Sequence, residues 1–370
     1  MTISPAPLAA LVHAAEATHS SALVILRNGQ PVVNEIMDTL GNRPMETMSV
    51  TKAVVSLLVG RAITLGYIQD VDSPVSFWFS EWRQGQKRHI TLRQVLTHTS
   101  GLQNVPLATQ EIYPSSDLLQ LALCAEIADP PGKQFAYNNK AVNLLIGVLE
   151  RATNQKADQF AAEQLFSPLG IENWWWQKDA AGNPHGMSGL QLCPLDLARL
   201  GQLALDDGQI NGAVLIDPAW MKLSTSPATT ATDSIGLLWW LLPAWTQYSV
   251  TETHLRNAQG ASIDTQQRQA LGAMLGTYPN SSALMARLQA TGFVPALLAP
   301  GTQWIDAAKG PQVGFRHDGW LGQHLVIHRE ARMVGVRLID AEHPKAGTPE
   351  SAFEDFVDQF VQLASLAPQE

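Results

Sequence analysis

The sequence contains little cysteine and no apolar stretch long enough to cross a membrane. Only Cys124 and Cys193 occur in 370 residues, so we expect free thiols and not a disulfide framework. We expect Cys124 to lie in the core, because it falls in an apolar helical pattern. The first 20 residues lack the basic and apolar regions of a secretory signal. These absences predict a cytoplasmic protein with no membrane partner.

Positive charge is also scarce. The chain has 24 basic and 33 acidic residues, a formal charge of -9, and no run of Lys and Arg. A nucleic-acid partner is therefore not expected.

The sequence offers no metal-binding cluster and no Gly-x-Ser-x-Gly motif. His324 and His328 lie four residues apart in a strand-like run, which separates them by about 13 Å, too far to share one ion. We expect neither metal nor cofactor. The segment Gly186-Met187-Ser188-Gly189 does not complete the Gly-x-Ser-x-Gly turn, which argues against an α/β-hydrolase.

A hydroxyl and an amine stand three residues apart at a predicted helix start. Ser49-Val50-Thr51-Lys52 precedes the apolar stretch 53–63, and residues three apart lie on one face of a helix. Lys52 can therefore reach Ser49 and, if uncharged, accept its proton. The free N–H groups of the helix start favour a developing oxyanion. This segment predicts a nucleophilic serine with its base.

Two distant segments offer partners for this pair. Tyr137-Asn138-Asn139 follows a Pro-Pro-Gly turn and precedes a helical pattern that can hold it rigidly. His317-Asp318-Gly319 ends a strand-like run, and Gly319 permits close backbone approach by a ligand. Tyr278-Pro279-Asn280 competes for the second role, but we interpret it as a solvated turn.

Together, these three segments resemble the motifs of the serine β-lactamase and penicillin-binding-protein superfamily. The branch that the chain resembles most is the class C β-lactamase-like serine hydrolases. Residues 90–102 and 194–201 also resemble this branch. Residues from about 240 to 311 do not align with it. The resemblance implies Ser49, Lys52 and Tyr137 as catalytic residues. It further implies that the Asn139 amide donates to a substrate carbonyl and accepts from Lys52. His317, Gly319 and Trp320 complete the implied substrate site, with the Trp320 N–H as the second oxyanion donor beside that of Ser49.

The identity of the base stays open between Lys52 and Tyr137. Lys52 needs a pKa lowered by burial or by nearby positive charge. Tyr137 is the alternative or cooperating base, ionised more easily beside Lys52 and a protonated His317. Asn138 is expected only to cap its loop. Because His317 stands where this branch more often has Lys, the permanent charge that would clamp a β-lactam carboxylate is weakened.

The strand and helix patterns predict an α/β (α+β) fold, and the resemblance implies that it is of the β-lactamase/transpeptidase type. Two runs around Asn28-Gly29 form a predicted hairpin, strands return near the C-terminus, and a helix over 351–366 follows. Residues 1–70 and 235–370 should form an antiparallel sheet flanked by helices. Residues 71–234 should form an all-helical domain, with the active site at the junction.

We therefore predict a serine hydrolase that cleaves a small ester or amide through a Ser49 acyl-enzyme. A β-lactamase or D-amino-acid peptidase is one alternative. A non-catalytic binding protein on the same scaffold is another. The sequence leaves the oligomeric state open, and most of its 11 Trp are expected in the core.

Overall fold

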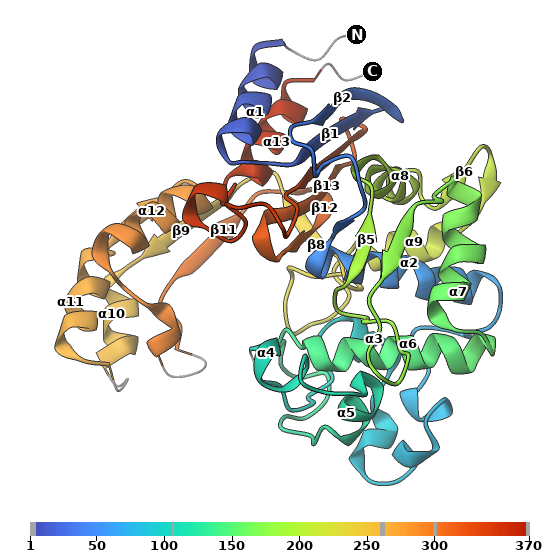
Figure 1. Cartoon of the computed structure of the whole chain (residues 1–370). Coiled ribbons are helices and arrows are strands. Elements are labelled where there is room, and N and C mark those ends of the chain that lie inside the picture. The colour runs from blue at the N-terminus through green and yellow to red at the C-terminus, as the bar shows by residue number, and fades with distance from the viewer. Residues whose placement is uncertain (1–4, 106, 260–262, 299–301, 368–370) are drawn as a thin grey trace.

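A six-stranded antiparallel sheet formed by both ends of the chain is the centre of the molecule (Figure 1). The computed structural model describes residues 5–105, 107–259, 263–298 and 302–367. The strand order is β2-β1-β14-β13-β12-β8. In chain order these strands are β1 (Ala22–Arg27), β2 (Gln30–Ile36), β8 (Trp240–Pro243), β12 (Gln312–Gly319), β13 (Gln323–His328) and β14 (Met333–Leu338). The predicted hairpin is present as β1 and β2, and Ala22 of β1 pairs with Leu338 of β14.

Both faces of this sheet are buried. Successive side chains of a strand point to opposite faces, and in β1 Leu23 and Ile25 pack in one core while Val24 and Leu26 pack in the other. The first face is covered by α1 (Pro5–Ala17) and α13 (Phe356–Ser365), and the second by α8 (Pro194–Leu205). Helices therefore enclose the sheet on both sides, as predicted.

Most of the remaining helices pack in a second region below the sheet in Figure 1. These are α2 (Thr51–Thr64), α3 (Leu92–Leu96), α4 (Ala108–Glu111), α5 (Leu118–Cys124), α6 (Asn139–Thr153), α7 (Ala157–Ala161) and α9 (Pro218–Ser224). Short strands accompany them: β3 (Met45–Glu46), β4 (Trp174–Trp176), β5 (Leu190–Leu192), β6 (Gln209–Ile210) and β7 (Ala213–Val214). The fold class predicted from the sequence is confirmed, while the domain boundaries 1–70 plus 235–370 and 71–234 stay a prediction.

The stretch that could not be aligned forms a separate unit, which Figure 1 shows projecting to one side. It contains the sheet β10-β9-β11 and three helices around their own apolar cluster. Its elements are β9 (Thr246–Val250), α10 (Glu252–Gln259), α11 (Thr265–Ala273), β10 (Gly276–Tyr278), α12 (Ser281–Thr291) and β11 (Asp306–Lys309). Tyr278 itself is buried in this cluster and so does not lie in the predicted solvated turn, whereas Pro279 after it is exposed in a bend.

One further expectation was wrong. Cys124 is exposed, because it is the last residue of α5 and lies beyond the buried face that Leu118 and Ala122 form. Within the described ranges, no helix is both long and apolar enough to cross a bilayer.

Candidate active site

Ser49 and Lys52 lie in direct contact at the start of α2. Ser49 belongs to a 3₁₀ turn, Met48–Val50, which continues directly into the helix. Lys52 Nζ is 3.0 Å from Ser49 Oγ, and it donates to the Met187 carbonyl at 2.8 Å. Met48 has a φ of 50°. This left-handed conformation is energetically unfavourable for a residue other than glycine, and such conformations are frequent at functional sites.

The turn that presents Ser49 is held by strand β5. The hydroxyl and the N–H of Thr47 both donate to the Leu190 carbonyl at 2.9 Å. The residues just before β5 include Met187, so the same strand that holds the turn also brings an acceptor to Lys52. Ser49 and Lys52 are thus fixed relative to each other by main-chain groups.

Lys52 is a buried amine. Its side chain is 0% exposed, and burial lowers its pKa well below the ordinary value, since an ammonium ion in a dry site loses its hydration. Among the described residues no carboxylate pairs with it; its hydrogen bonds go to Ser49 and Met187. The uncharged amine is therefore favoured.

Tyr137 completes the group in the loop before α6. Its hydroxyl lies near enough to Ser49 for the serine side chain to affect its pKa, and Lys52 Nζ lies 4.9 Å from the centre of its ring. Burial raises the pKa of Tyr137 to about 12, and the nearby Ser49 side chain opposes this only in part. The expectation that Tyr137 would ionise more easily here was wrong, because loss of hydration dominates.

The two asparagines after Tyr137 differ in their surroundings. Asn138 caps α6, since its Oδ1 accepts from the Ala141 N–H at 2.9 Å, in agreement with its expected capping role. Asn139 is the first residue of the helix. Its Oδ1 is buried and has no hydrogen-bond partner in the described part of the chain. The expected bond from Lys52 to Asn139 is not formed; Lys52 donates to Met187 instead.

His317 lies deep in the site and is neutral. His317 is 1% exposed, and its Nδ1 hydrogen bonds with the Asp318 carbonyl at 2.9 Å. Burial lowers its pKa well below the ordinary value, and any charge on Lys52 would lower that pKa further. The expectation that His317 would be protonated is therefore wrong, because a buried imidazolium would lose its hydration.

Gly319 and Trp320 bring the end of β12 to the turn that holds Ser49. A Cβ at Gly319 would lie 2.7 Å from the Thr47 carbonyl oxygen and 2.8 Å from the Met48 Cβ. Only glycine permits so close an approach. Trp320 follows in the turn Trp320–Gly322 and is 73% exposed. The backbone of the third motif thus touches the turn that presents Ser49.

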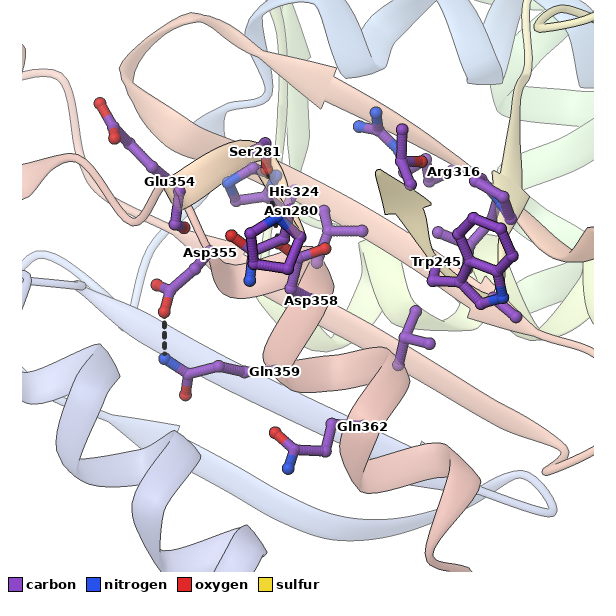
Figure 2. A pocket seen from close by; sticks show the side chains of 18 of the residues that line it. Trp245, Asn280, Ser281, Arg316, His324, Glu354, Asp355, Asp358, Gln359 and Gln362 are labelled. Carbon is purple, nitrogen blue, oxygen red and sulfur yellow. Dashed lines mark hydrogen bonds between the residues drawn. The ribbon is translucent and has the colours of Figure 1, made fainter. Parts of the chain in front are cut away.

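The opposite face of β12 lines a cavity of about 700 Å³. Figure 2 shows Arg316, His324 and Asp358 around it. Asp318 also lines it, pairs with Arg316 and is 2.9 Å from His324 Nδ1. Since neighbouring residues of a strand alternate in direction, His317 faces Lys52 while Arg316 and Asp318 face this cavity. Ser49, Lys52 and Tyr137 do not line it.

Three neighbours of the site were not predicted from the sequence. The Met187 carbonyl binds Lys52, the Trp240 ring stacks on Tyr137 with centroids 6.1 Å apart, and the His98 ring lies 4.6 Å from the Tyr137 ring. A main-chain acceptor leaves no signal in the sequence. His98 belongs to the segment 90–102, which was noted only for its resemblance. In the described residues, no three His, Cys, Asp or Glu side chains are grouped so that they could hold a metal.

A model of the family named Beta-lactamase matches residues 8–357. The chain therefore belongs to the β-lactamase family, and the resemblance inferred from the three motifs is confirmed.

Individual relatives are distant. A β-lactamase of Escherichia coli (strain K12) is 30% identical over 147 residues, which are 40% of this chain and 36% of that protein. Esterase EstB of Burkholderia gladioli is 28% identical over 181 residues, 40% of this chain and 45% of that protein. The chain thus spans less than half the length of these curated relatives. A penicillin-binding protein homologue from Caulobacter crescentus has a TM-score of 0.63 at 16% identity, covering 100% of this chain and 99% of that one, and it shows the shared fold.

Proposed function

We propose that this protein is a serine hydrolase that cleaves a small ester or amide through an acyl-enzyme on Ser49. The observation that supports the proposal is the 3.0 Å contact between Ser49 Oγ and the buried Lys52 Nζ. A charged lysine cannot accept a proton, whereas a desolvated amine can. The Met187 carbonyl takes one N–H of Lys52, which leaves the nitrogen lone pair free to face Ser49.

Acylation would begin with attack of Ser49 Oγ on the substrate carbonyl carbon, while its proton passes to Lys52. The N–H groups of Ser49 and Trp320 are proposed to donate to the oxyanion that forms. The bond to the leaving group then breaks, and the leaving group takes the proton that Lys52 accepted. In deacylation, water gives a proton to Lys52 and its oxygen attacks the ester. That proton returns to Ser49 as the acid product leaves.

Tyr137 and Asn139 would assist as neutral groups. With a pKa of about 12, the Tyr137 phenol keeps its proton near neutral pH and acts as a hydrogen-bond partner of Ser49, so Lys52 is the proposed base. The Asn139 amide, whose Oδ1 has no partner among the described residues, has hydrogen-bonding capacity for a substrate amide or carbonyl.

The neutral His317 favours uncharged substrates. A β-lactam or a peptide C-terminus carries a carboxylate, which binds best to a permanent cation. His317 offers none, and Arg316 lies on the opposite face of β12. We therefore rank esters above β-lactams and D-alanyl peptides as substrates.

A substrate panel tests this ranking. The full chain and Ser49→Ala would be assayed with p-nitrophenyl esters of increasing acyl length, a chromogenic cephalosporin and peptides that end in D-alanyl-D-alanine. We expect ester hydrolysis that disappears in Ser49→Ala. Faster turnover of the cephalosporin or of the D-alanyl substrate would replace esterase by the corresponding alternative.

A fluorophosphonate probe separates the hydrolase from a binding protein on the same scaffold. It labels an activated serine covalently. We expect labelling of the native chain and none of Ser49→Ala. An unlabelled native chain that is folded would favour the binding protein.

A further inference from the structure

His98 occupies a buried and conformationally restricted position beside the site. It follows α3 in the turn Thr97–Gly101, is 2% exposed, and has a φ of 55°. A non-glycine residue adopts this conformation rarely, and asparagine and histidine tolerate it better than most. Nothing in the acylation chemistry described above uses this side chain.

His98 accepts two hydrogen bonds from the residues on either side of Tyr137. The Ala136 N–H donates to the His98 carbonyl at 2.9 Å, and the Asn138 N–H donates to His98 Nδ1 at 3.1 Å. The Tyr137 carbonyl in turn accepts from Asn104 Nδ2 at 3.0 Å. The backbone on both sides of Tyr137 is thus tied to one neighbouring loop.

The imidazole also contacts the phenol ring itself. The ring centroids of His98 and Tyr137 are 4.6 Å apart with an angle of 39° between the planes. On its other side, Tyr137 stacks on Trp240 at 6.1 Å and 17°. Two rings therefore restrict the direction in which the phenol points.

The hydrogen bond from Asn138 defines the form of the imidazole. Nδ1 can accept an N–H only when it carries no proton, so Nε2 holds the single proton of the neutral ring. Nε2 is buried and has no partner among the residues that the structure describes. Burial is the main cause that lowers the pKa of His98 to about 3, so the accepting form persists through the neutral range.

We propose that His98 is a positioning residue that holds the Tyr137 hydroxyl against Ser49 through the Asn138 N–H and the ring contact. The inference rests on the proposed function, because it assigns His98 a role only if Tyr137 assists Ser49. It does not make His98 a catalytic residue, since its described contacts are with the Tyr137 loop. A displaced phenol would slow acylation without weakening substrate binding to the same degree.

A double-mutant cycle tests this role. His98→Phe keeps a ring and removes the acceptor, and it would be made in the native chain and in Tyr137→Phe. With a p-nitrophenyl ester, we expect kcat to fall on the order of 10-fold to 100-fold in the native background, with a much smaller change in KM. In the Tyr137→Phe background the same substitution should change kcat less than about twofold, because the group it positions is gone.

His98→Asn gives a second, gentler variant. Asparagine tolerates positive φ and its Oδ1 can accept from the Asn138 N–H, so we expect a smaller loss of kcat that also vanishes in the Tyr137→Phe background. This variant decides the matter if His98→Phe does not fold. The matched control is His328→Asn. His328, at the end of β13, is also buried, and its Nδ1 accepts the Ala331 N–H at 3.2 Å. In this variant, kcat should stay within about twofold of the native value.

The outcomes separate this inference from the proposed function. Equal losses of kcat from the His98 substitutions in both backgrounds, or losses no larger than in His328→Asn, would reduce His98 to a structural residue. Retention of ester hydrolysis in Ser49→Ala would defeat the proposed function itself. Full activity of Tyr137→Phe would remove the premise that Tyr137 assists Ser49, and the role of His98 would fall with it.

Discussion

Replacement of Lys52 by methionine should reveal the charge state of the buried amine in the stability of the protein. Methionine is an unbranched, flexible side chain without an ionisable group. In the unfolded chain the Lys52 amine has its ordinary pKa of about 10.4, whereas burial in the folded protein lowers that pKa well below its usual range. Between these two pKa values the unfolded state binds one more proton than the folded state.

The sign of the pH dependence follows from this difference. Where the unfolded state binds more protons, the free energy of unfolding increases with pH, by about 1.4 kcal/mol per pH unit for one proton. Lys52→Met lacks the group, so the difference in free energy of unfolding between the two proteins isolates it. We expect the native chain to lose about 1.4 kcal/mol relative to the variant for each unit that the pH falls, down to the pKa of folded Lys52.

Urea unfolding of both proteins at several values between about pH 7 and 9.5 measures this slope. The activity provides an independent reading. The acidic limb of kcat/KM for a p-nitrophenyl ester should have its midpoint where the stability slope ends, because both report the same amine. Lys52→Met itself should lower kcat by about 10²-fold to 10⁴-fold, the usual contribution of a general base.

Lys140→Met is the matched control for activity. Lys140 is also buried, but its Nζ donates to Gln103 and Glu111 and not to Ser49. We expect this variant to lose stability, because Glu111 loses its partner, and to keep kcat within a few-fold of the native value. A stability difference between Lys52→Met and the native chain that does not change with pH over the whole range would refute the uncharged amine.

Three further predictions concern the neighbours of Lys52. Tyr137→Phe should lower kcat by roughly 10²-fold. Because the pKa of Tyr137 is about 12, kcat/KM of the native chain should show no phenol titration below about pH 11. An alkaline limb near pH 9 that disappears in Tyr137→Phe would contradict this. Gly319→Ala should destabilise the fold by about 1–3 kcal/mol, because its Cβ would meet the Thr47 carbonyl at 2.7 Å. It should also slow the labelling of Ser49 by a fluorophosphonate; unchanged labelling kinetics would argue against contact between β12 and the turn that holds Ser49. Asp318→Asn breaks the pairs with Arg316 and His324 on the face away from Ser49, so we expect a lower thermal midpoint with kcat within a few-fold; a loss as large as that of Tyr137→Phe would place Asp318 in the reaction.

The sequence predicted those features that depend on neighbours in the chain. The hairpin around Asn28-Gly29 and the contact between Ser49 and Lys52 each follow from local geometry. The closing helix was predicted over 351–366, but α13 covers only Phe356–Ser365. Its predicted first turn is instead a 3₁₀ turn at Pro349–Ser351 that ends in extended backbone at Ala352, while Phe353 is buried all the same. The apolar Phe353 therefore fits the helical spacing in the sequence because it is buried, although the backbone before it is not helical.

The features that the sequence did not predict depend on contacts between distant segments. The Met187 carbonyl reaches Lys52 across 135 positions, and a carbonyl is the same for every residue type. The direction of the Tyr137 pKa shift was also wrong, because the pattern of charges was visible in the sequence while the depth of burial was not. The unit from β9 to β11 has strands of three to five residues, too short to leave a clear alternation.

The electrostatics of the site give the proposed reaction its direction. Burial lowers the pKa of Lys52, His98 and His317, and a charge on one of them would oppose a charge on the others, so the resting site favours no net charge. A positive charge on Lys52 becomes favourable only when a negative charge appears beside it. That happens when the Ser49 proton moves and the carbonyl oxygen becomes an oxyanion. The interaction between the ammonium and the oxyanion would therefore exist in the transition state and not in the ground state, which is the condition for raising kcat instead of merely tightening binding.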